Sequence, residues 1–152
     1  MLFSFSLHRC GSFLHKLPRF VQLSAVREFT SVAEFNKVAD ETLESLHEYF
    51  DELLDRCPCI VDNELKDGVL NVSLDHSGSK TYVINKQSVN LQVWLSSPIS
   101  GPKRFDYYEK EDAWIYRRTK QSLHQLLQLE ISDVIPEKVD FSKCEHSGKT
   151  GK

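Results

Sequence analysis

The chain has 152 residues, of which 40% are hydrophobic, which is enough for one globular domain with its own core. Its formal net charge of −3 is unevenly distributed, because residues 1–27 contain four basic residues and no acidic one, so the rest carries −7. An acidic chain of this kind is not expected to bind nucleic acid, since neutralising phosphates needs clustered Lys and Arg. No apolar run is long enough to span a membrane, so no membrane partner is expected.

The N-terminal segment contains Arg and Ser, lacks acidic residues and has no continuous apolar run, because polar residues interrupt it from Ser4 to Ser12. This composition is typical of a mitochondrial transit peptide and does not fit a secretory signal. We therefore expect residues 1–28 to be a transit peptide. An N-terminus without any targeting role is the alternative that the composition leaves open.

A long amphipathic helix is predicted to begin after Ser31, because Ser31 is a suitable N-cap and Glu34 follows at capping-box spacing. Apolar residues then recur every three or four positions, namely Phe35, Ala39, Leu43, Leu46, Phe50 and Leu53. Pro58 prevents the helix from continuing, so it is expected to end near Arg56.

Short segments with strand character follow, and turn residues separate them. They cover residues 59–65, 69–74, 81–85, 91–95, 104–108 and 113–117. A hairpin connection is expected at 76–79 and a loop at 98–102. Strands this short, at such spacing, indicate an antiparallel meander.

A second helix is expected from Thr119 or Ser122 up to Pro136, and residues 142–152 are expected to form a flexible tail. The order helix, strands, helix predicts an α+β two-layer sandwich, in which both helices pack on one face of an antiparallel sheet of five or six strands. The other face of such a sheet is free to contact solvent or a partner.

The segment around Trp94 indicates what that open face carries. Alternation in a strand puts Val93 and Leu95 on one face and Gln92 and Trp94 on the other, so the tryptophan lies among polar side chains. Two interpretations remain: Trp94 lies flat against its neighbours for structural reasons, or it is the anchor of an interface, where Trp and Arg are enriched.

The first helix also carries seven acidic residues between positions 40 and 55, namely Asp40, Glu41, Glu44, Glu48, Asp51, Glu52 and Asp55. Glu41, Glu44, Glu48, Glu52 and Asp55 form a row opposite its apolar face. Like charges three or four residues apart destabilise a helix by ~0.2–0.5 kcal/mol per pair. The row is either a solvated face without a ligand or a surface for a basic partner or hard cations such as iron, manganese, calcium and magnesium. An open row offers few ligands per ion, so weak and multiple sites are expected.

The cysteines indicate neither a disulfide framework nor a zinc site, because Cys57 and Cys59 have no second pair at ligand spacing. We interpret them as ordinary residues at a helix-to-strand junction, with iron or persulfide chemistry as the alternative. The sequence has no nucleophile elbow, P-loop or dinucleotide-binding motif, so no catalytic residues are predicted.

The stretches NLQVWLSSP (residues 90–98) and SGPKR (residues 100–104), preceded by Asn85-Lys86-Gln87, resemble the signature of the frataxin family. The acidic stretch ADETLESL (residues 39–46) and SLHQLL (residues 122–127) extend this resemblance. It implies a frataxin-like domain over residues 29–141. It also implies an iron-binding accessory protein of iron–sulfur cluster assembly in the mitochondrial matrix, which docks on the cysteine desulfurase–scaffold complex and promotes persulfide transfer or iron delivery.

The resemblance also implies the sites. By position, the residues that contact the assembly complex are Asn85, Gln87, Gln92, Trp94 and Arg104. The seven acidic residues at positions 40–55 of the first helix correspond to the family's acidic ridge, which would bind Fe2+ or Fe3+ weakly. A monomer is expected, with metal-driven oligomers as an option. The alternative is a ferroxidase or iron-storage protein that acts through the acidic ridge.

Overall fold

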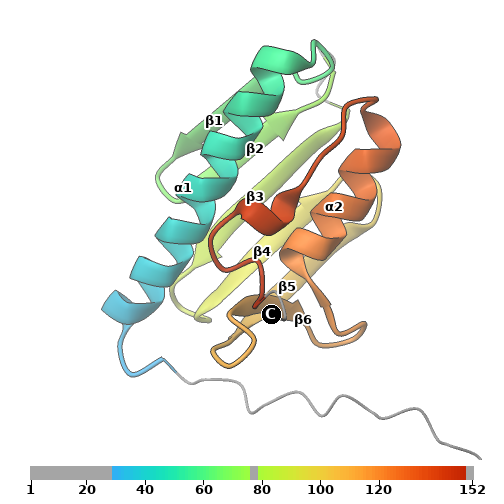
Figure 1. Cartoon of the computed structure of the whole chain (residues 1–152). Coiled ribbons are helices and arrows are strands. Elements are labelled where there is room, and N and C mark those ends of the chain that lie inside the picture. The colour runs from blue at the N-terminus through green and yellow to red at the C-terminus, as the bar shows by residue number, and fades with distance from the viewer. Residues whose placement is uncertain (1–28, 76–78, 150–152) are drawn as a thin grey trace, which may run out of the picture.

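The structure is a computed structural model that describes residues 29–75 and 79–149. The expected transit peptide, residues 1–28, and most of the expected hairpin connection, residues 76–78, lie outside the described residues. Two helices lie side by side on one face of an antiparallel sheet, as the sequence predicts (Figure 1).

Helix α1, Val32–Arg56, begins and ends where the sequence predicts. The Ser31 hydroxyl accepts a hydrogen bond from the backbone N–H of Glu34 at 3.1 Å, which satisfies one of the free donors of the first turn. At the other end Cys57, which precedes Pro58, is extended. Neither helix in the described ranges combines the length and apolar composition that a membrane crossing requires.

The sheet contains seven strands in sequential order, one more than the upper end of the prediction. The strands are β1 (Asp62–Lys66), β2 (Val69–Ser73), β3 (Thr81–Gln87), β4 (Gln92–Ser97), β5 (Gly101–Tyr108), β6 (Ala113–Tyr116) and β7 (Gln121–Ser122). The additional strand β7 is only two residues long, too short to produce an alternating pattern. Its last residue, Ser122, is at the same time the N-cap of helix α2, Leu123–Val134.

The core fills the space between the helices and the sheet. Val93 and Leu95 of β4 face it and are at most 1% exposed, whereas Leu91 lies in the preceding turn and only partly packs against it. Trp114 is fully buried in this core, where its indole N–H donates to the Thr42 hydroxyl at 2.8 Å. The two tryptophans of the chain therefore lie on opposite faces of the sheet.

The prediction of a flexible tail from residue 142 is wrong for residues 142–149. The chain continues in a short 3-10 helix, η1 (Phe141–Lys143), and the segment that follows lies between α1 and α2 (Figure 1). The Phe141 ring packs against Tyr49 and Phe50 of α1, with ring centroids 5.0 and 5.4 Å apart, and Cys144 is buried. The composition of the segment is polar, but the buried side chains of Phe141 and Cys144 hold it against the helices.

Candidate functional site

The five residues predicted to contact a partner meet on the open face of the sheet. Strand pairing places Asn85 of β3 opposite Trp94 of β4, and Trp94 opposite Arg104 of β5. Gln87 lies opposite Gln92 at the neighbouring position of the same face. Three adjacent strands thus bring together residues that are up to 19 positions apart in the sequence.

Trp94 is held in place on this face by contacts on two sides. Its indole N–H donates to the Gln92 side-chain oxygen at 3.0 Å, and the Arg104 guanidinium carbon lies 4.4 Å from the centre of its ring. A cation this close to an aromatic face is attracted to it. Trp94 is only partly buried and belongs to no core cluster of the described residues. A side chain that is fixed and still accessible suits an interface.

Two residues that the sequence analysis did not single out complete this arrangement. Asp106 accepts from the Gln92 amide at 2.9 Å through one carboxylate oxygen, and its other oxygen lies 2.7 Å from the Arg117 Nε. Asp106 is 9% exposed, so this carboxylate is nearly buried on the open face. The sequence could have indicated Asp106, because alternation along β5 puts positions 104 and 106 on the same face of the sheet. We call Asn85, Gln87, Gln92, Trp94, Arg104, Asp106 and Arg117 the docking face.

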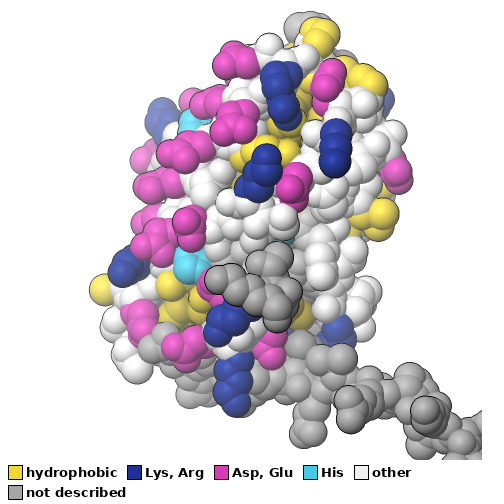
Figure 2. All heavy atoms as spheres, in the orientation of Figure 1, with side chains coloured by type: hydrophobic (Ala, Val, Ile, Leu, Met, Phe, Trp, Pro, Cys, Tyr) yellow, Lys and Arg dark blue, Asp and Glu magenta, His cyan; other side chains and the backbone are white. Residues whose placement is uncertain are grey.

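The seven acidic residues between positions 40 and 55 of α1 form a row along the exposed side of this helix, and we call them the acidic ridge (Figure 2). Three of them have partners. Asp40 pairs with Lys86 at 2.6 Å, Asp51 accepts from the Asn63 amide at 2.8 Å, and Glu41 lies 3.0 Å from His146. The remaining members form no ion pair or hydrogen bond within the described residues, namely Glu44, Glu48, Glu52 and Asp55.

The acidic ridge is not a preformed metal cage. Among residues 29–75 and 79–149, no group of three or more His, Cys, Asp or Glu side chains is arranged to hold a metal ion. A surface depression between the ridge and the C-terminal segment, residues 142–149, is lined by Glu41, Glu44, Ser45, Glu48 and Glu145. Carboxylates with this spacing can supply one or two oxygens to a hard cation, with water as the remaining ligands.

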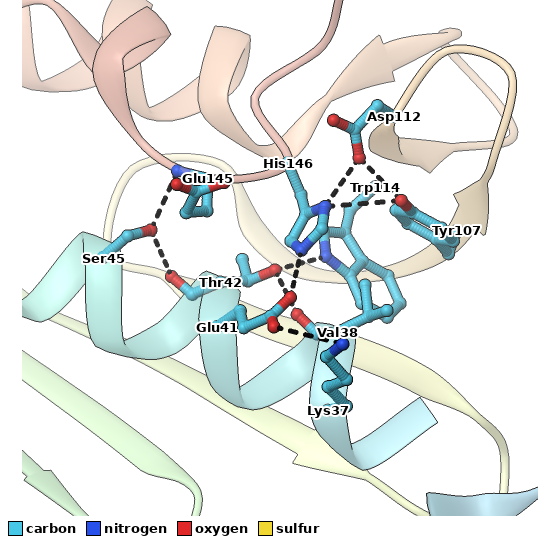
Figure 3. A network of polar contacts seen from close by, with 10 residues as sticks. All are labelled: Lys37, Val38, Glu41, Thr42, Ser45, Tyr107, Asp112, Trp114, Glu145 and His146. Atoms are coloured by element: carbon cyan, nitrogen blue, oxygen red, sulfur yellow. Dashed lines mark hydrogen bonds and ion pairs between the residues drawn. The ribbon is translucent and has the colours of Figure 1, made fainter. Parts of the chain in front are cut away.

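The C-terminal segment is tied to the acidic ridge by His146 (Figure 3). One ring nitrogen of His146 lies 2.6 Å from Asp112 and the other lies 3.0 Å from Glu41, while the Tyr107 hydroxyl donates to Asp112 at 2.6 Å. Burial lowers the pKa of His146, but its bonds to the two carboxylates outweigh burial and raise it above the ordinary value. The same contacts lower the pKa of Asp112 despite its burial. The sequence analysis gave no indication of this cluster.

The cysteine thiols do not form a reactive site. Cys57 and Cys144 are buried, and no disulfide joins the cysteines of the described residues. Burial raises the pKa of Cys144 to about 12, and the hydrogen bond with Cys57 raises the pKa of Cys59. Because the thiolate is the reactive form, both shifts disfavour nucleophilic chemistry at neutral pH.

These features define a class of protein, namely a small α+β sandwich. Polar and aromatic side chains are held together on the sheet face opposite the helices, and a row of carboxylates lies on the helical layer. A family model described as the frataxin-like domain matches residues 28–137. The chain belongs to the frataxin family.

Individual relatives agree with this assignment. The chain is 42% identical to a protein named mitochondrial frataxin from Caenorhabditis elegans, over 82% of this chain and 92% of that protein. It is 45% identical to the mitochondrial frataxin homolog of Drosophila melanogaster, over 75% of this chain and 62% of that protein's length. The structure is similar to trimeric frataxin from Saccharomyces cerevisiae complexed with ferrous iron, with a TM-score of 0.58 and 36% identity, covering 77% of this chain and 94% of the yeast chain.

Proposed function

We propose that this chain is a mitochondrial accessory protein of iron–sulfur cluster assembly, which docks through its sheet on the cysteine desulfurase–scaffold complex. There it promotes persulfide transfer to the scaffold and delivers iron. The observation that carries the proposal is Trp94, fixed by Gln92 and Arg104 on a sheet face that neither α1 nor α2 of the described residues covers. A relative from Thioalkalivibrio sulfidiphilus, 39% identical over 101 residues, is named an iron-sulfur cluster assembly protein, CyaY.

The physical argument for docking is preorganisation. Immobilising a side chain at an interface costs ~0.5–1.5 kcal/mol, and this cost is reduced when its rotamer is already fixed before binding. Trp94 is held by both Arg104 and Gln92, and Arg104 is held by Trp94. Trp and Arg are also the residue types that carry most of the binding energy in interfaces.

Iron is the cargo in this proposal, and the acidic ridge is where it would bind. Glu44, Glu48, Glu52 and Asp55 keep their carboxylates unpaired within the described residues, so a cation does not have to displace an internal partner there. The solved yeast relative is complexed with ferrous iron, which supports the choice of metal. We propose several weak Fe2+ sites rather than one tight site, with Fe3+ as a further occupant.

The experiment that tests docking is a desulfurase assay with the assembled scaffold complex, with and without this protein. Trp94→Ala should abolish the stimulation and leave the circular dichroism spectrum unchanged, because Trp94 lies outside the core clusters. Leu129→Ala is the matched control, since Leu129 is a large apolar residue, 57% exposed, on helix α2. Undiminished stimulation by Trp94→Ala would contradict the proposal.

A second candidate function is iron oxidation or storage through the acidic ridge. The trimeric state of the yeast relative favours it, because storage requires assembly. Sedimentation with excess Fe2+ tests storage, which a monomeric species would exclude. Oxygen consumption by the wild type and by a Glu44→Gln, Glu48→Gln variant tests oxidation, since a turnover that the variant loses would support a ferroxidase.

The mitochondrial location is proposed together with cleavage of residues 1–28. Relatives named mitochondrial support it, and so does the absence of acidic residues from positions 1–27. The mass of the protein isolated from mitochondria tests it. A mass corresponding to the full 152 residues would contradict cleavage.

A further inference from the structure

One buried carboxyl group belongs to neither the docking face nor the acidic ridge. Glu130 of α2 is 5% exposed, and one of its oxygens accepts a hydrogen bond from the Ser97 hydroxyl of β4 at 2.5 Å. Its other oxygen forms no hydrogen bond within the described residues. Burial and the nearby charge of Glu130 raise the pKa of Tyr82, which is fully buried on β3. An apolar side chain would suit such a position better, so stability alone does not explain this carboxyl group.

The Ser97 hydroxyl joins Glu130 to the loop between β4 and β5. It donates its only proton to Glu130, and its oxygen accepts from the backbone N–H groups of Ile99 and Ser100, both at 3.0 Å. From β5, the Lys103 ammonium donates to the backbone oxygen and the hydroxyl of Ser100, at 2.8 and 2.6 Å. The loop is therefore tied to both strands and, through Ser97, to helix α2.

This loop connects the two strands that carry Trp94 and Arg104. Strand pairing puts Ser97 opposite Gly101 at the end of the hairpin, and Trp94 opposite Arg104 three positions further along. Alternation along β4 puts Ser97 on the core side, where it is buried, and Trp94 on the open face. Glu130 and Trp94 thus lie on opposite sides of the sheet, so any effect of Glu130 on the docking face passes through the backbone of the hairpin.

We propose that Glu130 is a positioning residue for docking, an inference that rests on the proposed function. By fixing the direction of the Ser97 O–H bond, its carboxyl group keeps the lone pairs of the Ser97 oxygen directed at the two N–H groups of the loop. This holds the hairpin against α2 and keeps its strands in the register that places Arg104 4.4 Å from the ring of Trp94. Preorganisation of this kind lowers the cost of ordering the docking face on binding.

The test compares two substitutions of Glu130 with a buried control on the same helix. Glu130→Met removes the hydrogen-bond acceptor and keeps a side chain of similar length, whereas Glu130→Gln keeps an acceptor oxygen. Leu123→Ala is the control, because Leu123 is apolar and fully buried two turns earlier in α2. Binding to the desulfurase–scaffold complex should weaken about tenfold for Glu130→Met, and by less than about twofold for Glu130→Gln and Leu123→Ala. Equal losses for Glu130→Met and Leu123→Ala would overturn the inference.

Amide hydrogen exchange in the free protein separates positioning from a general loss of stability. The backbone N–H groups of Ile99 and Ser100 should exchange about tenfold faster in Glu130→Met than in the wild type, because the Ser97 oxygen no longer faces them. In Leu123→Ala the exchange of these two groups should be unchanged. An acceleration of equal size in both variants would show general loosening and overturn the inference.

The indole N–H resonance of Trp94 reports whether the change reaches the docking face. The chain has two tryptophans, and Trp94→Ala identifies which of the two indole signals belongs to Trp94. This signal should shift in Glu130→Met and stay in place in Glu130→Gln, because Trp94 donates to Gln92 at a distance that depends on the position of β4. An unshifted signal in Glu130→Met would overturn the positioning role even if binding weakened.

Ser97→Ala tests whether Glu130 acts through the Ser97 hydroxyl. If it does, the double variant Ser97→Ala, Glu130→Met should bind the complex no more weakly than Ser97→Ala alone. Additive losses in the double variant would overturn this route.

The measurements on the free protein also separate this inference from the proposed function. If the wild type does not bind the complex but the exchange and indole effects appear, the proposed function fails and Glu130 still positions the hairpin. If the wild type binds the complex and neither effect appears in Glu130→Met, the proposed function stands and the inference fails.

Discussion

The docking face and the acidic ridge are both polar surfaces, but they are built differently. On the docking face, Trp94, Gln92, Asp106 and Arg117 are linked one to the next by hydrogen bonds or an ion pair of 3.0 Å or less. On the acidic ridge, four of the seven carboxylates have no partner within the described residues. The side chains of the docking face are therefore fixed before a partner binds, while the acidic ridge keeps carboxylates free to bind a cation.

This difference indicates the kind of ligand that each surface suits. Fixed side chains give specificity, because a partner that fits them does not have to order them. Free carboxylates on a helix accommodate several cations in several positions, with low selectivity. The two roles are therefore separable, and a change on one surface should leave the function of the other unchanged.

The largest expected effect concerns the helical layer. Phe141→Ala should lower the free energy of unfolding by about 3–5 kcal/mol, because the ring is fully buried between the C-terminal segment and α1. Chemical denaturation measures this loss. Under native conditions Phe141→Ala should retain its affinity for the assembly complex. A loss of binding free energy as large as the loss of unfolding free energy would contradict the separation of the two layers.

The second prediction is a pH dependence that originates in the helical layer. Burial lowers the pKa of His124, on α2, to about 4, so the folded state keeps this ring neutral. The unfolded chain takes up its proton near pH 6.5. The free energy of unfolding should therefore fall as the pH falls from about 6.5 to about 4.

His124→Leu isolates this contribution, because the substitution removes the titrating group and keeps an apolar side chain in the core. Denaturation curves at several pH values should be flatter between pH 6.5 and pH 4 for the variant than for the wild type. An identical slope for both proteins would contradict the assignment to His124.

The third prediction tests whether Asp106 positions Trp94. In Asp106→Asn the amide that replaces one oxygen can no longer accept from both Gln92 and Arg117, so the docking affinity should fall by about 1–2 kcal/mol. Calorimetric titration of the complex measures it. Asp133→Asn is the charge-matched control on the exposed side of α2, and an affinity of Asp106→Asn equal to that of the control would refute the positioning role.

The smallest expected effect concerns the acidic ridge itself. Glu44→Gln with Glu48→Gln removes like-charge neighbours, so the free energy of unfolding should rise by ~0.2–0.5 kcal/mol for each repulsive pair removed. Thermal unfolding at low and high salt measures this. The difference between variant and wild type should shrink at high salt, because the repulsion is screened. A destabilised variant would show that these carboxylates stabilise the fold.

The sequence predicts the helices and the signature strand well, because local rules decide them. Ser31 and Pro58 determine where α1 begins and ends, and alternation places Val93 in the core and Trp94 outside. The prediction of the docking face was incomplete, because the contact of Asp106 with Gln92 depends on the register of two strands. A sequence pattern alone does not give that register.

The C-terminal segment could not be predicted for a related reason. His146 meets Glu41 across 105 positions, and both belong to stretches that look solvated in the sequence. Such a contact forms only because the end of the chain packs against α1 in the folded protein. The polar composition of residues 142–149 indicated a loose tail because composition carries no information about this long-range packing.

The central claim is that the docking face binds the assembly complex and the acidic ridge binds iron independently. The most direct test measures complex binding and Fe2+ binding on the same two variants, Trp94→Ala and the Glu44→Gln, Glu48→Gln double variant. Trp94→Ala should lose complex binding by at least about 2 kcal/mol and keep its Fe2+ binding, while the double variant should do the reverse. Complex binding that survives in Trp94→Ala, or that disappears in the double variant, would contradict the claim.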